Sequence, residues 1–235
     1  MMLTTLLTIA TSPALAKCAR PGPAAYPTVE VLASEPVLHL FVPKHQEPDP
    51  IFTLDGVALD VELVPVSETP AYSVFRAEIP ADEGALTLNW GYRNQQWTLD
   101  PDADVDSAPA SIGIEKAEME SSGWVCSYTS LWNLTPTVLA PVYRVEVAAD
   151  RESWSAGKRR SFLVPGDLRQ MWGVSAVNTM VQVGHANCFG HTFEWADDDA
   201  SVWVALVGVY PDGTETELGT PIRLPAPPPR GGTRR

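Results

Sequence analysis

The chain has 235 residues, with 29 acidic against 16 basic side chains and a formal net charge of −13. A field of that sign repels nucleic-acid phosphates and anionic membranes, so neither is expected as a partner. The length suits one large domain or two of about 100 residues each. The 22 prolines favour turns and strand edges over long helices.

The first segment, residues 1–16, has the pattern of a signal peptide. It holds no charged side chain, has an apolar stretch around Leu3–Ala10 and ends in Ala14–Ala16, a small-x-small sequence of the kind that a signal peptidase cuts. The usual Lys or Arg before the apolar stretch is missing, and an apolar strand is the alternative interpretation. No stretch approaches the ~20 apolar residues that span a bilayer. We therefore expect a secreted or periplasmic protein in which residues 17–26 form a short N-terminal segment.

Residues 27–99 alternate short apolar runs with turn residues, which is typical of a β-domain. Asp55-Gly56 between two apolar runs predicts a tight hairpin. In Tyr72–Ile79 the polar residues recur nearly every second position, which predicts one buried face. The expected strands are Thr28–Leu32, Val37–Val42, Ile51–Leu54, Leu59–Val66, Tyr72–Ile79, Leu86–Trp90 and Gln96–Leu99.

Residues 100–109 are acidic, contain proline and have little to bury, so we interpret them as a linker between domains. Four aspartates alternate along this segment: Asp100, Asp102, Asp104 and Asp106. An EF-hand loop also needs Gly and Glu where Val105 and Ser111 stand, so that loop is excluded. The remaining hypotheses are a looser calcium site and a solvated acidic linker.

Residues 110–224 form a second block of short apolar runs. The expected strands are Ser111–Met119, Trp124–Trp132, Val142–Ala148, Ser161–Val164, Val174–Val183, Thr192–Trp195, Ser201–Val209 and Glu215–Leu224. If Trp124–Trp132 is one strand, Trp124, Cys126, Tyr128 and Trp132 share a face in the core.

Near its end the second block has a long apolar strand, a Pro-Asp-Gly-Thr turn at Pro211–Thr214 and a final strand. This hairpin and the eight expected strands resemble fibronectin type III domains, whose last two strands form such a hairpin. The first block more loosely resembles the immunoglobulin-like modules of bacterial secreted proteins. The resemblances imply an all-β fold of two tandem antiparallel β-sandwiches, immunoglobulin-like over 27–99 and fibronectin type III-like over 110–224. The proline-rich, basic residues 225–235 are expected to be a disordered tail.

The chain has three cysteines, Cys18, Cys126 and Cys188, and no CxxC pair, which excludes zinc ribbons and thioredoxin-like redox chemistry. An oxidising compartment would pair two of them. The second and fifth strands of a fibronectin-like sandwich are neighbours, so the resemblance implies a Cys126–Cys188 disulfide that closes a loop of about 60 residues. Cys18 would then be free or link two copies.

Two metal-site hypotheses remain. His185, Cys188 and His191 carry suitable donor atoms, but in one extended strand the two histidines would lie about 20 Å apart, and only a tight turn would gather them. The fibronectin resemblance also implies that the turn at Asp212 lies at the same pole as the linker. Asp212 would then join the linker aspartates at a calcium site, as in cadherin-like arrays.

The sequence contains no GxSxG elbow, no HExxH motif and no phosphate-binding glycine loop, so we expect no catalysis. Trp154 lies in a polar segment and Trp172 beside Gly173, so each ring either covers the edge of the core or is exposed, where it could stack on sugars or anchor a protein interface. We expect a secreted, non-catalytic binding or structural protein of the extracellular space or cell envelope with a protein partner. A glycan bound by exposed tryptophans is the alternative; an enzyme or a metal-binding protein is a lesser one. The linker calcium is the only cofactor considered.

Overall fold

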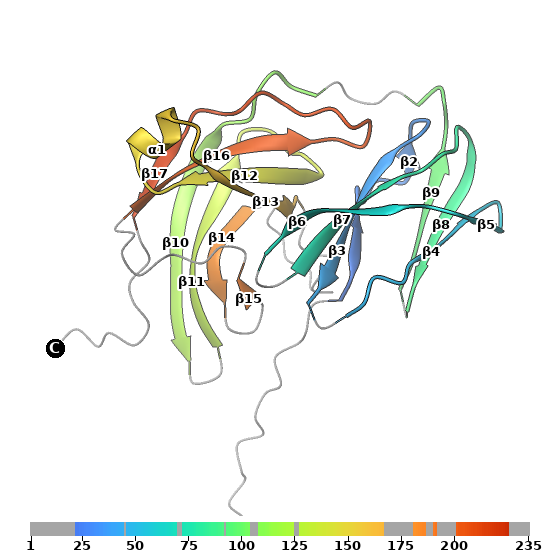
Figure 1. Cartoon of the computed structure of the whole chain (residues 1–235), viewed down its shortest axis with the longest axis horizontal. Coiled ribbons are helices and arrows are strands. Elements are labelled where there is room, and N and C mark those ends of the chain that lie inside the picture. The colour runs from blue at the N-terminus through green and yellow to red at the C-terminus, as the bar shows by residue number, and fades with distance from the viewer. Residues whose placement is uncertain are drawn as a thin grey trace, which may run out of the picture.

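The structure, a computed structural model, describes residues 22–44, 46–69, 72–91, 93–103, 108–124, 127–166, 181–186, 190–191 and 201–225. Within these residues the strands form four sheets, and one short helix, α1 (Arg151–Ser155), accompanies them (Figure 1). The all-β prediction is therefore confirmed. The predicted signal peptide, Cys18 and the tail after Pro225 lie outside the described residues.

Residues 24–99 form two sheets. Sheet A has the strand order β1-β3-β7-β6 and sheet B the order β2-β9-β8-β4-β5. The strands are β1 (Ala24–Tyr26), β2 (Val31–Leu32), β3 (Val37–Pro43), β4 (Ile51–Leu54), β5 (Val57–Leu59), β6 (Leu63–Glu68), β7 (Tyr72–Glu78), β8 (Gly84–Trp90) and β9 (Arg93–Leu99).

The predicted hairpin at Asp55-Gly56 is confirmed. Leu54 pairs with Val57, and the two residues between them have φ values of 49° and 80°. Positive φ at both central positions is what a two-residue turn requires when it follows the twist of its strands.

Two predicted strands of this block have wrong bounds because the chain changes sheet at the start of one and inside the other. Thr28–Leu32 is replaced by β1 in sheet A and β2 in sheet B, with the cis peptide Tyr26–Pro27 between them. Leu59–Val66 is divided between β5 in sheet B and β6 in sheet A. Apolar alternation reports which residues are buried but not which sheet a strand joins.

Sheet A is covered on both faces, so every residue of β3 is buried. Leu38, Leu40 and Val42 belong to the core shared with sheet B. Phe41 faces the other way and forms edge-to-face contacts with Tyr26 and Tyr72, each at 5.3 Å between ring centroids. The single buried face predicted for Tyr72–Ile79 is therefore wrong: Val74 belongs to the cluster around Phe41, whereas Ala77 belongs to the core shared with sheet B.

Residues 114–225 form the other two sheets. Sheet C has the order β10-β11-β14-β15 and sheet D the order β13-β12-β16-β17. The strands are β10 (Ile114–Trp124), β11 (Ser127–Pro136), β12 (Val142–Ala148), β13 (Arg160–Pro165), β14 (Val181–Ala186), β15 (Gly190–His191), β16 (Ser201–Val209) and β17 (Ile222–Pro225). Val145, Val183 and Leu206 are among the fully buried residues that join the two sheets in one core.

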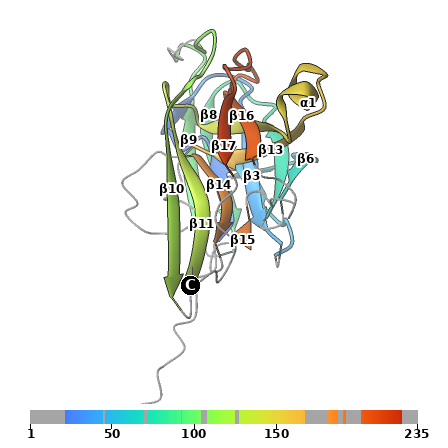
Figure 2. The same ribbon diagram turned by 90° about the vertical axis from the view of Figure 1, so that its left-hand side faces the viewer.

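The predicted strand Trp124–Trp132 is also wrong. Trp124 pairs with Ser127 as the last pair between β10 and β11, so the chain reverses direction between these two residues. Trp124 and Trp132 therefore lie on different strands, and Cys126 lies outside the described residues. Figure 2 shows the resulting β10–β11 hairpin along one side of the molecule.

Sheets A and D pack against each other. Tyr26, Phe41, Tyr72 and Val74 from sheet A share a buried cluster with Val142, Leu163 and Val209 from sheet D. Three hydrogen bonds accompany this cluster: Val37 N–H to the Pro211 carbonyl at 2.5 Å, Leu163 N–H to Ser67 Oγ at 2.9 Å, and Tyr72 O–H to the Leu163 carbonyl at 3.4 Å. Sheet A therefore lies between sheet B and sheet D.

Candidate functional site

Trp154, predicted to be an exposed ring in a loop, lies in helix α1. The Asp150 side chain caps this helix by accepting a hydrogen bond from Ser153 N–H at 2.6 Å, and this bond lowers the pKa of Asp150. The Trp154 ring is half-buried, and the guanidinium of Arg159 lies 5.2 Å from its centroid. One side of the ring is thus occupied by a cation. Trp172 lies outside the described residues.

The predicted calcium ligands are only partly described, because Asp104 and Asp106 fall in a gap. Asp100 Oδ1 accepts a hydrogen bond from Asp102 N–H at 2.9 Å, which closes a local turn. Asp212 Oδ1 accepts from Thr214 N–H at 2.9 Å and from its hydroxyl at 2.7 Å. Among the described residues no three carboxylate, imidazole or thiol side chains gather around a common point.

Cys126 and Cys188 both lie in gaps of the structure, but the strands beside them are described. Ser127 begins β11 and Ala186 ends β14, and these strands are neighbours in sheet C with Thr129 paired to Ala186. The predicted disulfide remains a prediction.

His185 and His191 do not lie on one extended strand, so the large separation expected in that case does not apply. The chain turns between them, and the two residues are direct backbone partners of β14 and β15. Cys188 lies in the connection, outside the described residues.

A surface that the sequence analysis missed covers the outward side of sheet B. Side chains along a strand point alternately to its two faces. Leu86, Leu88 and Trp97 point into the core, so their neighbours along the strands point outward. The outward residues are Val31, Asn94, Gln96, Thr98, Ala85, Thr87, Asn89, Ile51, Thr53 and Ala58. We call this set the neutral face, because none of its side chains is charged.

Strand pairing aligns the neutral face in rows. Gln96 pairs with Thr87, and Thr87 with Thr53, across the middle of the sheet. In the next row Asn94 pairs with Asn89, and the Asn94 amide donates to the Asn89 carbonyl oxygen at 3.0 Å. The first row therefore presents an amide beside two hydroxyls, and the second presents two hydrogen-bonded amides.

Two aliphatic side chains border these rows. Val31, on edge strand β2, is 48% exposed, and Ile51, on β4, is 57% exposed. The outward side of sheet C differs in charge, because it carries Lys116, Glu118 and Glu120, and the side of sheet D that faces sheet A carries Arg144 and Glu146. A face without charge is therefore a local property of sheet B in a chain of net charge −13.

The sequence did contain a signal for this surface. Asn94, Gln96 and Thr98 occupy alternate positions between Arg93 and Leu99, as do Ala85, Thr87 and Asn89 in the preceding strand. The register that sets them side by side comes from the fold.

Comparisons with known proteins place the chain in no established family. No family model matches it, and no curated protein matches it. Among solved structures, a type I pullulanase from Bacillus subtilis str. 168 complexed with maltose is similar at 9% identity and a TM-score of 0.26, over 84% of this chain and 24% of that one. A segment of titin is similar at 14% identity and a TM-score of 0.24, over 84% of this chain and 60% of the titin segment. The chain thus spans less than two thirds of either structure.

No helix in the described part of the chain has the length and apolar character needed to cross a membrane.

Proposed function

We propose that this chain is a secreted, non-catalytic binding protein that engages a protein partner through the neutral face of sheet B. In this proposal the chain comprises two tandem β-sandwiches, immunoglobulin-like over 27–99 and fibronectin type III-like over 110–224. Residues 1–16 direct export to the extracellular space or the periplasm. The absence of charge from the outward side of sheet B is the observation that carries the proposal.

The composition of the neutral face suits the centre of a protein interface. Charged side chains are depleted there, because a charge that loses its water without gaining a partner is costly. Hydroxyl and amide groups such as those of Thr87 and Gln96 can both donate and accept hydrogen bonds. Val31 and Ile51 add exposed apolar area on either side, which strengthens association when it is removed from water.

A glycan held by stacked tryptophans has less support among the described side chains. Trp90 and Trp97 are buried in the core of the first two sheets. Trp154 and Trp203 each have an arginine guanidinium within 6 Å of the ring. The Trp132 indole donates a hydrogen bond to the Pro225 carbonyl at 3.0 Å. None of these rings offers the neighbouring free platform that stacking on successive sugars requires.

The proposal is tested by placing one charge in the middle of the neutral face. Thr87→Arg is the test variant. Thr135→Arg is its control, because Thr135 pairs with Lys116 on the charged outward side of sheet C. Both tagged variants and the wild type are used to capture proteins from the extracellular fraction of the native host, with chemical cross-linking and mass spectrometry.

We expect one partner to be captured by the wild type and by Thr135→Arg, and to be lost with Thr87→Arg. Sedimentation of the purified protein separates self-association from binding of another chain. If all three proteins capture the same set, the neutral face is not the interface. Retention of the wild type on insoluble polysaccharide, with no protein captured, would favour the glycan alternative.

A further inference from the structure

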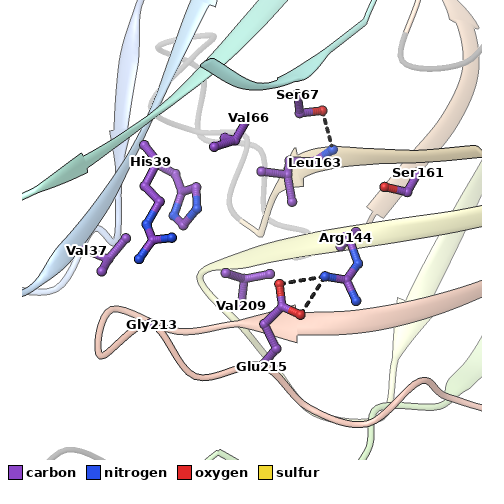
Figure 3. A pocket seen from close by; sticks show the side chains of 11 residues that line it. Val37, His39, Val66, Ser67, Arg144, Ser161, Leu163, Val209, Gly213 and Glu215 are labelled. Carbon is purple, nitrogen blue, oxygen red and sulfur yellow. Dashed lines mark hydrogen bonds and ion pairs between the residues drawn. The ribbon is translucent and has the colours of Figure 1, made fainter. Parts of the chain in front are cut away.

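A cleft of about 180 Å³ lies between sheets A and D. Residues of both sheets line it: Val37, His39, Val66, Ser67, Arg76, Arg144, Ser161, Leu163, Val209, Gly213 and Glu215. Figure 3 shows His39 on one side of this cleft and Arg144 with Glu215 on the other. Sheet A separates the cleft from the neutral face, so the two surfaces are independent.

The sheet A wall contains an arginine with one unpartnered N–H group. His39 and Arg76 are register partners on β3 and β7, which sets their side chains on the same face. One guanidinium nitrogen of Arg76, Nη2, lies 2.7 Å from exposed Glu78, but its Nε is buried and has no hydrogen-bond partner among the described residues. A buried N–H without an acceptor costs free energy, so this atom favours a ligand that supplies one.

His39 is 7% exposed and borders the same space. Burial, and secondly the nearby charge of Arg76, lower its pKa to about 4. The imidazole is therefore neutral near pH 7. A neutral ring can donate one N–H to a ligand without a second positive charge beside Arg76.

On the sheet D side of the cleft, the positive charge of Arg144 is already paired with carboxylates. Arg144 Nη1 contacts both carboxylate oxygens of Glu215, at 2.6 and 2.5 Å, and Arg144 Nε lies 3.0 Å from Glu146. On the sheet A side, Ser67 Oγ accepts the hydrogen bond from Leu163 N–H and keeps its own O–H to donate. The Ser161 hydroxyl adds another donor.

The charged side chains that line the cleft are Arg76, Arg144 and Glu215. Glu78 is ion-paired with Arg76, and Glu146 with Arg144 and Arg159, so the charged groups around the cleft balance. Recognition of an anion here therefore depends on the unpartnered Nε of Arg76 rather than on an excess of positive charge.

We propose that this cleft binds a small carboxylate, held by Arg76 and His39 on sheet A and by the Ser161 hydroxyl on sheet D. The Nε and Nη groups of an arginine form a planar fork that matches the two oxygens of a carboxylate. The volume equals that of about six waters, at ~30 Å³ each, so the ligand has only a few non-hydrogen atoms inside the cleft. The carboxylate belongs to a free organic acid or to the end of a peptide.

Because the ligand would contact both sheets, binding should strengthen their packing. A ligand that binds only the folded state raises the midpoint of thermal unfolding in a saturable manner. The probes are sodium acetate, sodium succinate and a short peptide with a free C-terminal carboxylate, each tested against its amide or against sodium chloride at equal ionic strength. Sodium phosphate tests whether a tetrahedral oxyanion also fits.

Arg76→Gln is the test variant. Lys116→Gln is the control, because it removes the same charge from an exposed ion pair with Glu118 on sheet C. We expect a saturable rise with at least one carboxylate in the wild type and in Lys116→Gln, and at least tenfold weaker binding in Arg76→Gln. Arg76→Lys keeps the charge but loses the planar fork, so its affinity for the carboxylate should lie between those of the wild type and Arg76→Gln.

Calorimetric titration of the wild type with the same acids keeps the test decisive if Arg76→Gln does not fold. The proposal is overturned if the thermal-unfolding midpoint of the wild type depends only on ionic strength and the titration shows no heat of binding. Equal responses of folded Arg76→Gln and the wild type overturn it as well. Acetate or succinate binding identifies a free acid, whereas peptide binding alone identifies a chain terminus.

Discussion

The hydroxyl of Tyr72 donates a hydrogen bond to the carbonyl of Leu163, 91 residues away in the sequence, at 3.4 Å. Burial raises the pKa of Tyr72 well above its ordinary value, so the phenol remains a donor throughout the neutral range. The ring of Tyr72 also contacts Phe41 edge-on. One side chain thus contributes both a polar and an apolar contact to the junction of sheets A and D.

Substitutions at the junction of sheets A and D should distinguish the stability contributed by the Tyr72 hydrogen bond from the stability contributed by the apolar cluster. Tyr72→Phe removes one hydrogen bond and should lower the free energy of unfolding by about 1 kcal/mol. Phe41→Ala leaves a cavity among Tyr26, Tyr72 and Val74 and should cost about 3–5 kcal/mol. Urea unfolding followed by tryptophan fluorescence measures both. A smaller loss for Phe41→Ala than for Tyr72→Phe would show that the cluster contributes little to stability.

His39 should make the protein less stable as the pH falls. Its folded-state pKa of about 4 lies below the ordinary 6.5, so the unfolded chain binds more protons between these values. The stability is complete above pH 6.5 and decreases as the pH falls toward 4, by about 3 kcal/mol in all. Urea unfolding at steps from pH 7.5 to 4.5 measures the slope.

The matched variant for this slope is His39→Gln, which cannot titrate. The charged groups nearest His39 are Arg76 on the adjacent strand and Arg144 and Glu215 across the cleft. The pH dependence of stability that comes from these groups and from surface carboxylates is retained in His39→Gln. The wild type should therefore show the steeper loss between pH 6.5 and 5, and parallel curves would contradict the assignment to His39.

Two glycine-to-alanine changes should differ in cost because their surroundings differ. A Cβ on Gly219 would lie 2.0 Å from the backbone oxygen of Ile112, a fully buried residue, so the backbone has to move. A Cβ on Gly56 meets nothing within 4 Å, and only its φ of 80° opposes alanine. We expect Gly56→Ala to cost about 1 kcal/mol and Gly219→Ala about 3 kcal/mol. Thermal unfolding ranks them, and equal midpoints would contradict the close approach at Gly219.

The predicted Cys126–Cys188 disulfide, and with it the predicted export, is tested on protein recovered from the extracellular fraction of the native host. Peptide mapping without reductant should recover the two cysteines in one linked pair, in a chain that begins at Lys17. In the chain-entropy model the bridge stabilises by about 3–4 kcal/mol. Because a bridge needs both partners, Cys126→Ala, Cys188→Ala and the double variant should lose similar stability. Additive losses, or alkylation of both thiols without reductant, would show that no bridge forms.

The sequence predicted strands well where each run keeps to one sheet. Ile51–Leu54, Val142–Ala148 and Ser201–Val209 have the bounds expected for them. The misplaced strands have different causes: Leu59–Val66 spans a change of sheet, and Trp124–Trp132 spans the reversal between β10 and β11. A turn of two residues, such as that between Trp124 and Ser127, interrupts the apolar alternation too briefly to be recognised.

The candidate sites were less accessible to sequence reasoning. The outward rows of sheet B depend on register, which places Thr53 beside Thr87 although 34 residues separate them (87 − 53). The cleft depends on two sheets meeting, since His39 lies on β3 of sheet A and Arg144 on β12 of sheet D. His39 in the run Val37–Pro43 had been a lone polar residue among apolar ones. Strand pairing sets Arg76 beside it, and the packing of sheet D against sheet A places Arg144 and Glu215 across the cleft.

The position of sheet A between two other sheets bears on how the chain can be divided. A cut in the acidic segment after Leu99 would preserve every strand pair of the first two sheets. It would also uncover Phe41, Tyr72 and Val74, which are at most 4% exposed. A fragment that ends at Leu99 would therefore keep its strand pairing but expose an apolar surface, so strand pairing alone does not define a fragment that stays monomeric. We expect each half expressed alone to aggregate, and the intact chain to melt in a single step.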